Sequence, residues 1–442
     1  MTGLLRRRWP WVVAVFVVSL LTMAVALVTL LNRLGEAPLP ILQVAVPATP
    51  EVIARGQYLT RVGNCIACHT ARGGRDYAGG EGVETPFGTI FAPNLTPHDG
   101  TGLGGWTAAE FWRAMHNGRS RDGRLLYPAF PYPNYTLVTR EDSDAIFAYL
   151  QSLEPVDNAS RPHALRFPFN TQAALAVWRA LFFRPAASRA SIVVPAGAAD
   201  APQQARLNRG AYLVQGLGHC AACHTPRNAW GASQAWAPLQ GGMVAGQNWY
   251  APALDAASEA GLAGWEPDEA VALLTTGVSP RASVSGPMAD VVFHSLQHWS
   301  EADMRAAVAW LQALPQRQAR ATGNAIRPSQ AELRRGEQLY DRHCAECHGS
   351  QGEGQAQAFP ALAGNRAVLL HDPTNLVRVL LQGGYAPATA GNPRPFGMPP
   401  FMQTLSDQDM ADVLSFIRNA WGNEAGKVDT MAVHRARERR GP

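Results

Sequence analysis

The sequence has little net charge for its length and few cysteines. Basic and acidic residues nearly cancel, with 38 Lys and Arg against 34 Asp and Glu, and the net charge is +4 over 442 residues. A nucleic-acid-binding chain would concentrate positive charge on one face, so we exclude nucleic acid as a partner. The apolar fraction of 47% suffices for packed cores, which excludes a disordered chain, and the length suggests about three domains.

Alternation of apolar and polar residues with a period of two is also lacking, so no segment is predicted as a regular strand. The periodic segments follow the helical pattern instead. Several of them begin with an acidic first turn after a capping residue, at Thr139, Ser300 and Ser406, which is typical of a helix start. We therefore expect an all-α fold.

One long apolar run stands near the N-terminus. Three arginines at positions 6–8 precede an uncharged stretch over 9–31, and Asn32 and Arg33 follow. A helix of that length reaches roughly 35 Å, enough to cross a hydrocarbon core of about 30 Å. A cleaved signal would have an apolar region of about 7–15 residues and a small-x-small site, and neither condition is met. We predict a retained transmembrane anchor over 1–34, with everything after residue 33 exported.

All six cysteines fall in three copies of one pattern, Cys-x-x-Cys-His. The copies are Cys65 and Cys68 with His69, Cys220 and Cys223 with His224, and Cys344 and Cys347 with His348. This pattern is the attachment signature of c-type haem, because two thiols join the vinyl groups along one porphyrin edge and the adjacent histidine ligates the iron. We therefore expect three covalently bound haems, each with the motif histidine as an iron ligand.

Other uses of paired cysteines fit less well. A structural zinc site needs four ligands, usually from two paired knuckles, whereas each motif here stands alone. A thioredoxin-like redox pair lies between a strand and a helix and needs no following histidine. Structural disulfides occur in exported chains, but three vicinal loops would stabilise little. Haem attachment is the preferred interpretation.

The three motifs belong to a longer internal repeat. Each copy has an Arg-Gly pair followed by an aromatic residue before the motif, then a Pro-x-Leu turn, a helix that ends at glycine, and an apolar terminal helix. The pairs start at Arg55, Arg209 and Arg335, the aromatics are Tyr58, Tyr212 and Tyr340, and the turns start at Pro93, Pro252 and Pro360. We expect the glycine to let another helix approach. We expect the proline carbonyl to accept the Nδ1 proton of the haem histidine, which fixes the ring.

The repeat predicts three tandem domains of the class I cytochrome c type behind one transmembrane helix. The expected boundaries are 1–34 for the cytoplasmic flank and anchor, 35–50 for a linker, 51–155 for the first domain, 156–204 for a linker with a helix, 205–316 for the second domain, 317–330 for a linker, 331–424 for the third domain and 425–442 for a mobile tail. Proline and alanine in the first linker predict a semi-rigid tether that lifts the first domain off the bilayer. The helix of the second linker fits either packing on a neighbour or contact with lipid headgroups.

The loop before each terminal helix is the expected source of the second axial ligand. Met398 in the third repeat and Met288 in the second lie in that loop. Met402 is a weaker candidate in the third repeat, and Met243 is assigned to packing or the surface. A thioether opposite histidine raises the reduction potential of a haem.

The loop before the terminal helix of the first repeat contains Phe130 and no methionine. Met115, three residues before Gly118, carries a thioether where the other repeats have leucine, so we expect Met115 to be the sixth ligand of the first haem. Two alternatives stay open. Met115 packs as helix methionines usually do and leaves a five-coordinate iron, or His116 or another group ligates it.

With these parts in view, the chain resembles the triheme cytochrome c subunits of membrane-bound periplasmic dehydrogenases, which serve alcohol, aldehyde, gluconate and related oxidations. The resemblance runs from residue 51 to residue 421, and its most specific stretches are 92–97, 126–129, 163–168 and 288–292. It implies haem domains in the periplasm and electron transfer to ubiquinone or a terminal oxidase, whereas the single-pass anchor in the bacterial inner membrane is predicted from the apolar run over 9–31. Phe130 and the retained anchor depart from many relatives.

The resemblance also implies partners, namely a catalytic dehydrogenase subunit and a small iron-sulfur or accessory subunit. An aldehyde or N-heterocycle dehydrogenase of the molybdenum hydroxylase type, with molybdopterin and iron-sulfur clusters, is favoured over a quinoprotein with PQQ and a flavoprotein with FAD. Two other functions stay open: a donor cytochrome or subunit of a terminal oxidase, and a haem enzyme such as a peroxidase. We expect no substrate chemistry from this chain alone.

Overall fold

The computed structural model describes residues 2–40, 46–186, 200–244, 246–317, 326–356 and 358–438. The middle parts of the expected linkers, 41–45, 187–199 and 318–325, lie outside the described residues. The described chain is mostly helical, with a few short strands. We refer to residues 51–155, 205–316 and 331–424 as the first, second and third repeats.

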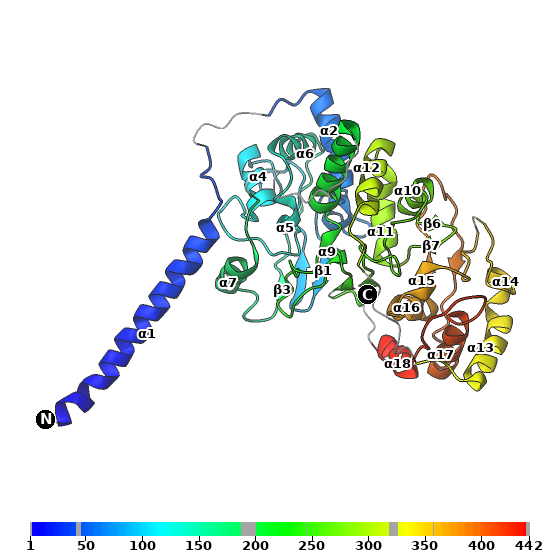
Figure 1. Cartoon of the computed structure of the whole chain (residues 1–442). Helices are drawn as coiled ribbons and strands as arrows, with labels where there is room; N and C mark the ends of the chain where they lie inside the picture. Colours follow the sequence, from blue (N-terminus) through cyan, green and yellow to red (C-terminus); the bar gives the residue numbers. More distant parts are fainter. Residues whose placement is uncertain are drawn as a thin grey trace.

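Helix α1 (Thr2–Arg33) projects away from the rest of the molecule (Figure 1). Its segment Trp9–Arg33 is long and apolar enough to cross a membrane, and none of its most apolar window is buried. The first residues after α1 are not a free linker, because they contact the rest of the protein. Asn32 Nδ2 donates to the carbonyl of Ala176 at 2.8 Å, and Arg119 forms an ion pair of 2.8 Å with Glu36. The expectation that the linker lifts the first repeat away is therefore wrong at its start, because residues 32–36 dock on the protein.

Each repeat contains two long helices that cross at the glycine of its Arg-Gly pair. The pairs are α2 (Pro50–Val62) with α6 (Arg140–Gln151), α8 (Ala201–Ala211) with α12 (Glu301–Gln312), and α13 (Gln330–His343) with α17 (Asp407–Ile417). A β-carbon at Gly56, Gly210 or Gly336 would overlap a backbone carbonyl oxygen of the crossing helix. Only glycine allows this approach.

The terminal helices begin where the sequence predicts. The side chains of Thr139, Ser300 and Ser406 accept hydrogen bonds from the backbone N–H three residues later. These side chains satisfy N–H groups that the helix itself cannot pair, and the prediction of the three caps is confirmed.

Shorter elements connect the crossing pairs. The first repeat adds α3 (Cys65–His69), β1 (Gly82–Thr85), β2 (Gly88–Phe91), α4 (Ala108–Asn117) and α5 (Tyr132–Tyr135), and the segment after it forms β3 (Ala164–Leu165) and α7 (Gln172–Phe182). The second repeat adds the π-helical turn η2 (Tyr212–Leu217), α9 (Ala221–His224), β4 (Gly242–Val244), β5 (Trp249–Ala251), α10 (Pro267–Thr276), β6 (Val278–Ser279), β7 (Ala282–Ser283), α11 (Pro287–His294) and the 3-10 turn η3 (Leu296–His298). The third adds α14 (Ala345–His348), α15 (Arg366–Leu369), α16 (Thr374–Gln382), β8 (Gly384–Tyr385) and β9 (Gly397–Met398), and α18 (Thr430–Glu438) follows.

The described residues also form short strands, which the sequence did not predict, within the mostly helical fold that was expected. β1, β2 and β3 form one antiparallel sheet, with Gly82 opposite Phe91 and Gly88 opposite Leu165. β4 pairs with β5, β6 with β7, and β8 with β9, all antiparallel. No strand in the described residues exceeds four residues, which is too short to leave a clear alternating pattern in the sequence.

The described residues pack around two separate hydrophobic cores. One continuous core spans the first and second repeats and includes Leu59, Ile146, Leu213 and Trp310. The third repeat has its own core around Tyr340, and in Figure 1 it lies beside the second repeat, on the side away from α1. The first two repeats therefore form one packed body.

Polar contacts join the third repeat to the second. The amide side chain of Asn375 on α16 brackets the backbone of Tyr250, accepting from its N–H at 2.8 Å and donating to its carbonyl at 2.7 Å. The Arg366 N–H donates to the Arg281 carbonyl at 2.9 Å. The Arg378 guanidinium lies over the Trp249 ring at 4.9 Å. These are directional contacts rather than a shared apolar core.

The C-terminal segment corrects another expectation. Instead of a mobile tail, residues 430–438 form α18, which packs on α16 and α17. Val433 is fully buried, and Arg437 forms an ion pair of 2.6 Å with Asp407. Residues 439–442 lie outside the described part of the chain.

Candidate haem-attachment sites

Each Cys-x-x-Cys-His motif forms one short helical turn, at α3, α9 and α14, after the first long helix of its repeat. All six cysteines are free thiols. Each turn thus presents two sulfurs and one imidazole within five residues, which is the donor set that covalent haem attachment requires. The residues present fit a c-type haem at each turn.

Each motif histidine is held by the proline of the following Pro-x-Leu turn. Nδ1 lies 2.8 Å from the Pro93 carbonyl oxygen in His69, 2.7 Å from that of Pro252 in His224, and 2.9 Å from that of Pro360 in His348. A carbonyl partner makes Nδ1 the protonated nitrogen and leaves Nε2 for a metal. Burial lowers the pKa of all three imidazoles, which favours the neutral form that ligates metal.

A glycine that the sequence reasoning missed closes this arrangement in every repeat. The N–H groups of Gly79, Gly241 and Gly354 donate to the carbonyls of the motif histidines at 2.7, 2.8 and 2.8 Å. Their φ angles of 78°, 74° and 65° are left-handed, and a β-carbon there would overlap backbone atoms at the proline turn. Only glycine suits such a position. Its distance from the histidine varies between 10, 17 and 6 residues, which hides it in the sequence.

The same loop anchors the leucine of each Pro-x-Leu turn. Leu95, Leu254 and Leu362 donate their N–H groups at 2.8, 2.8 and 2.7 Å to the carbonyl of the residue two before that glycine. Two of these acceptors, Tyr77 and Leu239, have a φ of 60°. A left-handed conformation costs on the order of 1–2 kcal/mol in a residue other than glycine. The surrounding hydrogen bonds must offset that cost.

The environment of five thiols, those of Cys65, Cys68, Cys220, Cys223 and Cys344, raises their pKa and keeps them protonated. Burial raises the pKa of Cys65 and Cys220 to about 12, and that of Cys344 to about 11. Redox-active Cys-x-x-Cys pairs have a lowered pKa instead, so this environment speaks against dithiol redox chemistry. Burial and the nearby Glu81 and Cys223 raise the pKa of Cys68 to about 11. The influence of Cys223 indicates that the first two motif turns lie near each other.

The expected methionine ligands of the second and third sites lie at the edges of the cores. Met288 is the second residue of α11 and packs half-buried against the shared core. Met398 lies in β9 and packs half-buried against the third core, as does Met402. Met243 is 42% exposed. Both candidate thioethers therefore border an apolar interior.

In the first repeat, Met115 is buried on α4, and Ser143 Oγ lies 3.9 Å from its sulfur. His116 stacks on Trp112 at 4.2 Å, and its Nε2 lies 3.1 Å from the Ala186 carbonyl oxygen. Phe130 contacts the ring of Tyr135, with centroids 5.4 Å apart. The two candidate ligands on α4 thus have different neighbours.

The first two sites are joined by an exchange of tyrosine hydroxyls. Tyr58 of the first repeat donates to Asp303 of the second at 2.6 Å, and Tyr212 of the second donates to Asp142 of the first at 2.6 Å. Each aspartate also pairs with the arginine of its own repeat, Arg55 with Asp142 and Arg209 with Asp303. Although burial alone would raise the pKa of Asp303, the hydrogen bonds from Arg209 and Tyr58 lower it.

The third repeat keeps the arginine pair without the exchange. Arg335 pairs with Asp412 at 2.7 Å, but the position equivalent to Tyr58 and Tyr212 is Gln338. Gln408 of the same repeat donates to Asp412 at 2.9 Å instead. Both side chains that donate to the Asp412 carboxylate therefore belong to the third repeat itself.

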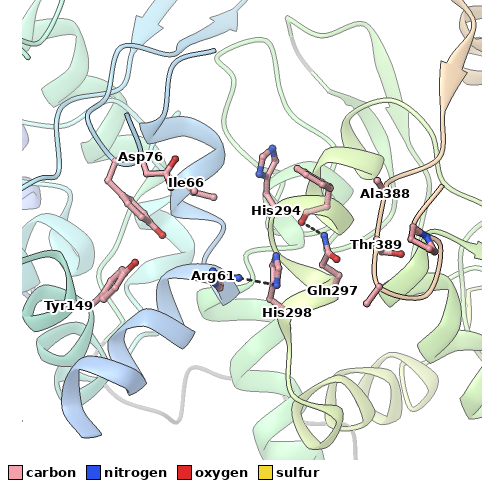
Figure 2. Close-up of a pocket in the computed structure, with 13 residues that line it drawn as sticks. Arg61, Ile66, Asp76, Tyr149, His294, Gln297, His298, Ala388 and Thr389 are labelled. Atoms are coloured by element: carbon pink, nitrogen blue, oxygen red, sulfur yellow. Dashed lines mark hydrogen bonds between the residues drawn. The ribbon is translucent and has the colours of Figure 1, made fainter. Parts of the chain in front are cut away.

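A cleft of about 470 Å³ lies where the three repeats meet. Figure 2 shows Ile66, Asp76 and Tyr149 of the first repeat on one side, His294 and His298 of the second in the middle, and a loop of the third with Ala388 and Thr389 on the other side. Arg61 Nη1 lies 3.0 Å from His298 Nδ1. Among the described residues, the lining holds no motif cysteine or motif histidine, but Ile66 belongs to the first motif turn.

The sequence is similar to those of known proteins. A family model described as cytochrome c matches residues 53–154 and 333–421. The cytochrome c subunit of quinone alcohol dehydrogenase from Gluconobacter oxydans (strain 621H) is 37% identical over 408 residues, which cover 88% of this chain and 83% of that protein. The gluconate 2-dehydrogenase cytochrome c subunit of Pantoea cypripedii is 35% identical, with 86% and 87% covered. A nicotinate dehydrogenase component of Pseudomonas putida is 38% identical over 88% of this chain, but only 32% of that protein is covered.

Proposed function

The chain belongs to the family of cytochrome c subunits of membrane-bound dehydrogenases, and on that premise we propose that it is a relay of three covalently bound haems. The observation that carries this proposal is the histidine bonded to a proline carbonyl at all three motif turns, at 2.8, 2.7 and 2.9 Å. Three turns built alike support three haem domains with the boundaries 51–155, 205–316 and 331–424.

Each site would work through the same residues. A haem bound there would supply one-electron redox chemistry at its iron. The paired cysteines hold the porphyrin edge, the histidine offers Nε2 to the metal, and the proline carbonyl and the loop glycine fix the ring. We propose Met288 and Met398 as the opposite ligands of the second and third irons. For the first iron we propose Met115, with a five-coordinate iron or ligation by His116 as the alternatives that experiment separates.

The partner is a catalytic dehydrogenase subunit that delivers electrons to the relay. The three relatives described above are named for alcohol, gluconate and nicotinate oxidation, so the preference for an aldehyde dehydrogenase of the molybdenum hydroxylase type has no support among them. A small accessory subunit, and ubiquinone or another respiratory acceptor, complete the proposal. Helix α1 supports a single-pass anchor in the inner membrane, with the repeats in the periplasm.

Haem counting tests this function directly. Purified protein should contain three haems per chain by pyridine haemochrome assay and intact mass. Replacing both cysteines of one motif with alanine, one motif at a time, should lower the count to two. A count of two in the unaltered protein would overturn the three-haem relay. Mass spectrometry of the complex purified through this chain should find a dehydrogenase subunit, and a copper-haem oxidase core in its place would overturn the partner.

A further inference from the structure

Helix α7 has an unusual distribution of side chains for a surface helix. Its only charged residue, Arg179, is 3% exposed, whereas Val177 and Leu181 are 47% and 64% exposed. Ala173, Val177 and Leu181 recur every four residues and form one stripe, and Phe182 beside it is 37% exposed. A helix that faces water shows polar residues outward. This helix turns its charge inward and its apolar face outward.

The end of the transmembrane helix is fixed to the middle of α7. The Asn32 amide donates to the Ala176 carbonyl at 2.8 Å and accepts from Arg179 Nε at 3.0 Å. Asn32 directly follows the last apolar residue of the span, Leu31. The centre of α7 therefore lies at the level where the hydrocarbon layer would end. In Figure 1, α7 lies beside that end of α1.

Aromatic and basic side chains extend this surface. Trp178 on α7 donates to the Trp230 carbonyl at 2.9 Å, and the Trp230 side chain is 59% exposed. Arg184, just beyond the helix, and Arg33, at the end of α1, are exposed. Tryptophan and arginine are the residues that favour the interface between lipid headgroups and acyl chains.

We propose that the outward face of α7, formed by Ala173, Val177, Leu181 and Phe182, lies in the interfacial layer of the bilayer. This inference rests on the proposed membrane anchor. Lipid is the occupant because the face continues directly from a membrane-spanning helix that is hydrogen-bonded to it. The chain thus attaches by two elements, a span and a helix that lies along the surface, and the pair fixes the orientation of the first repeat.

The same contact connects α7 to the first repeat. Arg179, whose side chain is bonded to Asn32, also donates to the carbonyl of Asn117 at the end of α4. Helix α4 carries Met115 and packs on α6. Helix α4, which carries the candidate ligand Met115, is therefore bonded directly to the helix that we place at the bilayer surface.

Site-specific labels in the full-length holoprotein test the placement. Leu181→Cys, labelled with a fluorophore and reconstituted in nanodiscs, should be quenched about twofold or more by nitroxide lipids labelled near the headgroup. Glu301→Cys is the matched control, because Glu301 is exposed on α12, which Figure 1 places far from α1. Ala24→Cys in the middle of α1 reports the anchor itself and should respond to deep nitroxides.

The outcomes are distinct. Quenching at 181 well above that at 301 supports the interfacial face. Equal, weak quenching at 181 and 301 with strong quenching at 24 overturns this inference but leaves the anchor. Absence of quenching at 24 removes the anchor and with it the basis of the proposal. Protection of 181 only after the catalytic partner is added would make the face a protein interface and would overturn the lipid assignment.

Discussion

The first two repeats and the third solve the same structural problem differently. In all three, an arginine on the first long helix holds an aspartate on the crossing helix. In the first and second repeats, a further hydrogen bond to the aspartate comes from a tyrosine of the other repeat. These two repeats also share one hydrophobic core. In the third the donor is Gln408 of the same repeat, around a separate core. One replaced residue, glutamine for tyrosine at 338, accompanies the change from two repeats that share a core to one that has its own.

The largest effect is expected where the helices cross. Gly210→Ala would force a methyl group into the Ala306 carbonyl, which is a more severe overlap than the overpacking that costs about 1–3 kcal/mol in a core. Because the first two repeats share a core, we expect both to unfold and both to become sensitive to protease. Gly336→Ala should expose only the third. If Gly210→Ala affected the second repeat alone, the idea of a shared body would fail.

A second comparison concerns the iron ligands outside the first repeat. Met398→Ala or Met288→Ala should open one iron to carbon monoxide and lower one reduction potential, by a substantial part of the roughly 0.8 V range that axial ligands set. Potentiometry of the full chain should resolve one shifted haem in each variant. An unchanged titration without new carbon monoxide binding in Met398→Ala would reject the assignment for the third site, and Met402→Ala is the matched control.

The first repeat should respond differently. If Met115 is a ligand, Met115→Leu should convert one low-spin haem to high-spin, and that haem should bind carbon monoxide after reduction. If the unaltered protein already has one high-spin haem and Met115→Leu leaves it unchanged, Met115 only packs beside Ser143, as its 3.9 Å contact allows. Potentiometry should place the most negative of the three potentials in this repeat.

The tyrosine exchange should have a moderate effect on stability. Tyr212→Phe removes a donor from Asp142, and a buried acceptor left unpaired costs about 1–3 kcal/mol. We expect denaturant unfolding of the combined first and second repeats to move to lower concentration, with the third unchanged. Tyr340→Phe is the converse control, since its hydroxyl donates to Gly349 within the third repeat. Equal shifts of both transitions in Tyr212→Phe would contradict the division.

The smallest effect is a pH dependence confined to the third repeat. The Ser329 backbone and side chain, with help from Lys427, lower the pKa of Glu332 from 4.5 to about 2. A lowered pKa in the folded state stabilises the fold above the unfolded value, and that stability is lost as the pH falls from 4.5 toward 2. Glu332→Gln should remove this dependence from the third transition. Because the Glu332 side chain is partly exposed and solvent screens its charge, we expect a small change, measured by thermal unfolding against pH.

The sequence carried most of what is local in this structure. Five-residue motifs, proline turns and caps depend on neighbours in the chain, so their patterns predicted the motif turns and the starts of α6, α12 and α17. The need for glycine at position 79 could not be predicted, because it arises from the Pro93 backbone, 14 residues further along the chain, which a β-carbon at position 79 would overlap. The hydrogen bond of Tyr58 could not be predicted either, since its acceptor, Asp303, lies 245 residues away.

Amino-acid composition led to wrong predictions for two polar segments that contact residues far away in the sequence. The tail 425–442 reads as solvated because it is rich in arginine, yet Arg437 finds Asp407 and Val433 is buried. The composition of the linker after α1 predicts a tether, yet Glu36 forms an ion pair with Arg119. In both cases the decisive partner lies on another element, which periodicity along one segment does not report.

The long reach of the Tyr58–Asp303 hydrogen bond also bears on how the protein is made. In the proposed topology the residues after α1 are exported in chain order, so 245 further residues follow Tyr58 before its acceptor arrives. Contacts of such separation form late, because the loop must close first. We therefore expect the first two motifs to stay accessible to the haem-attachment machinery until the second repeat has been exported, whereas the third can close as soon as its own residues are complete.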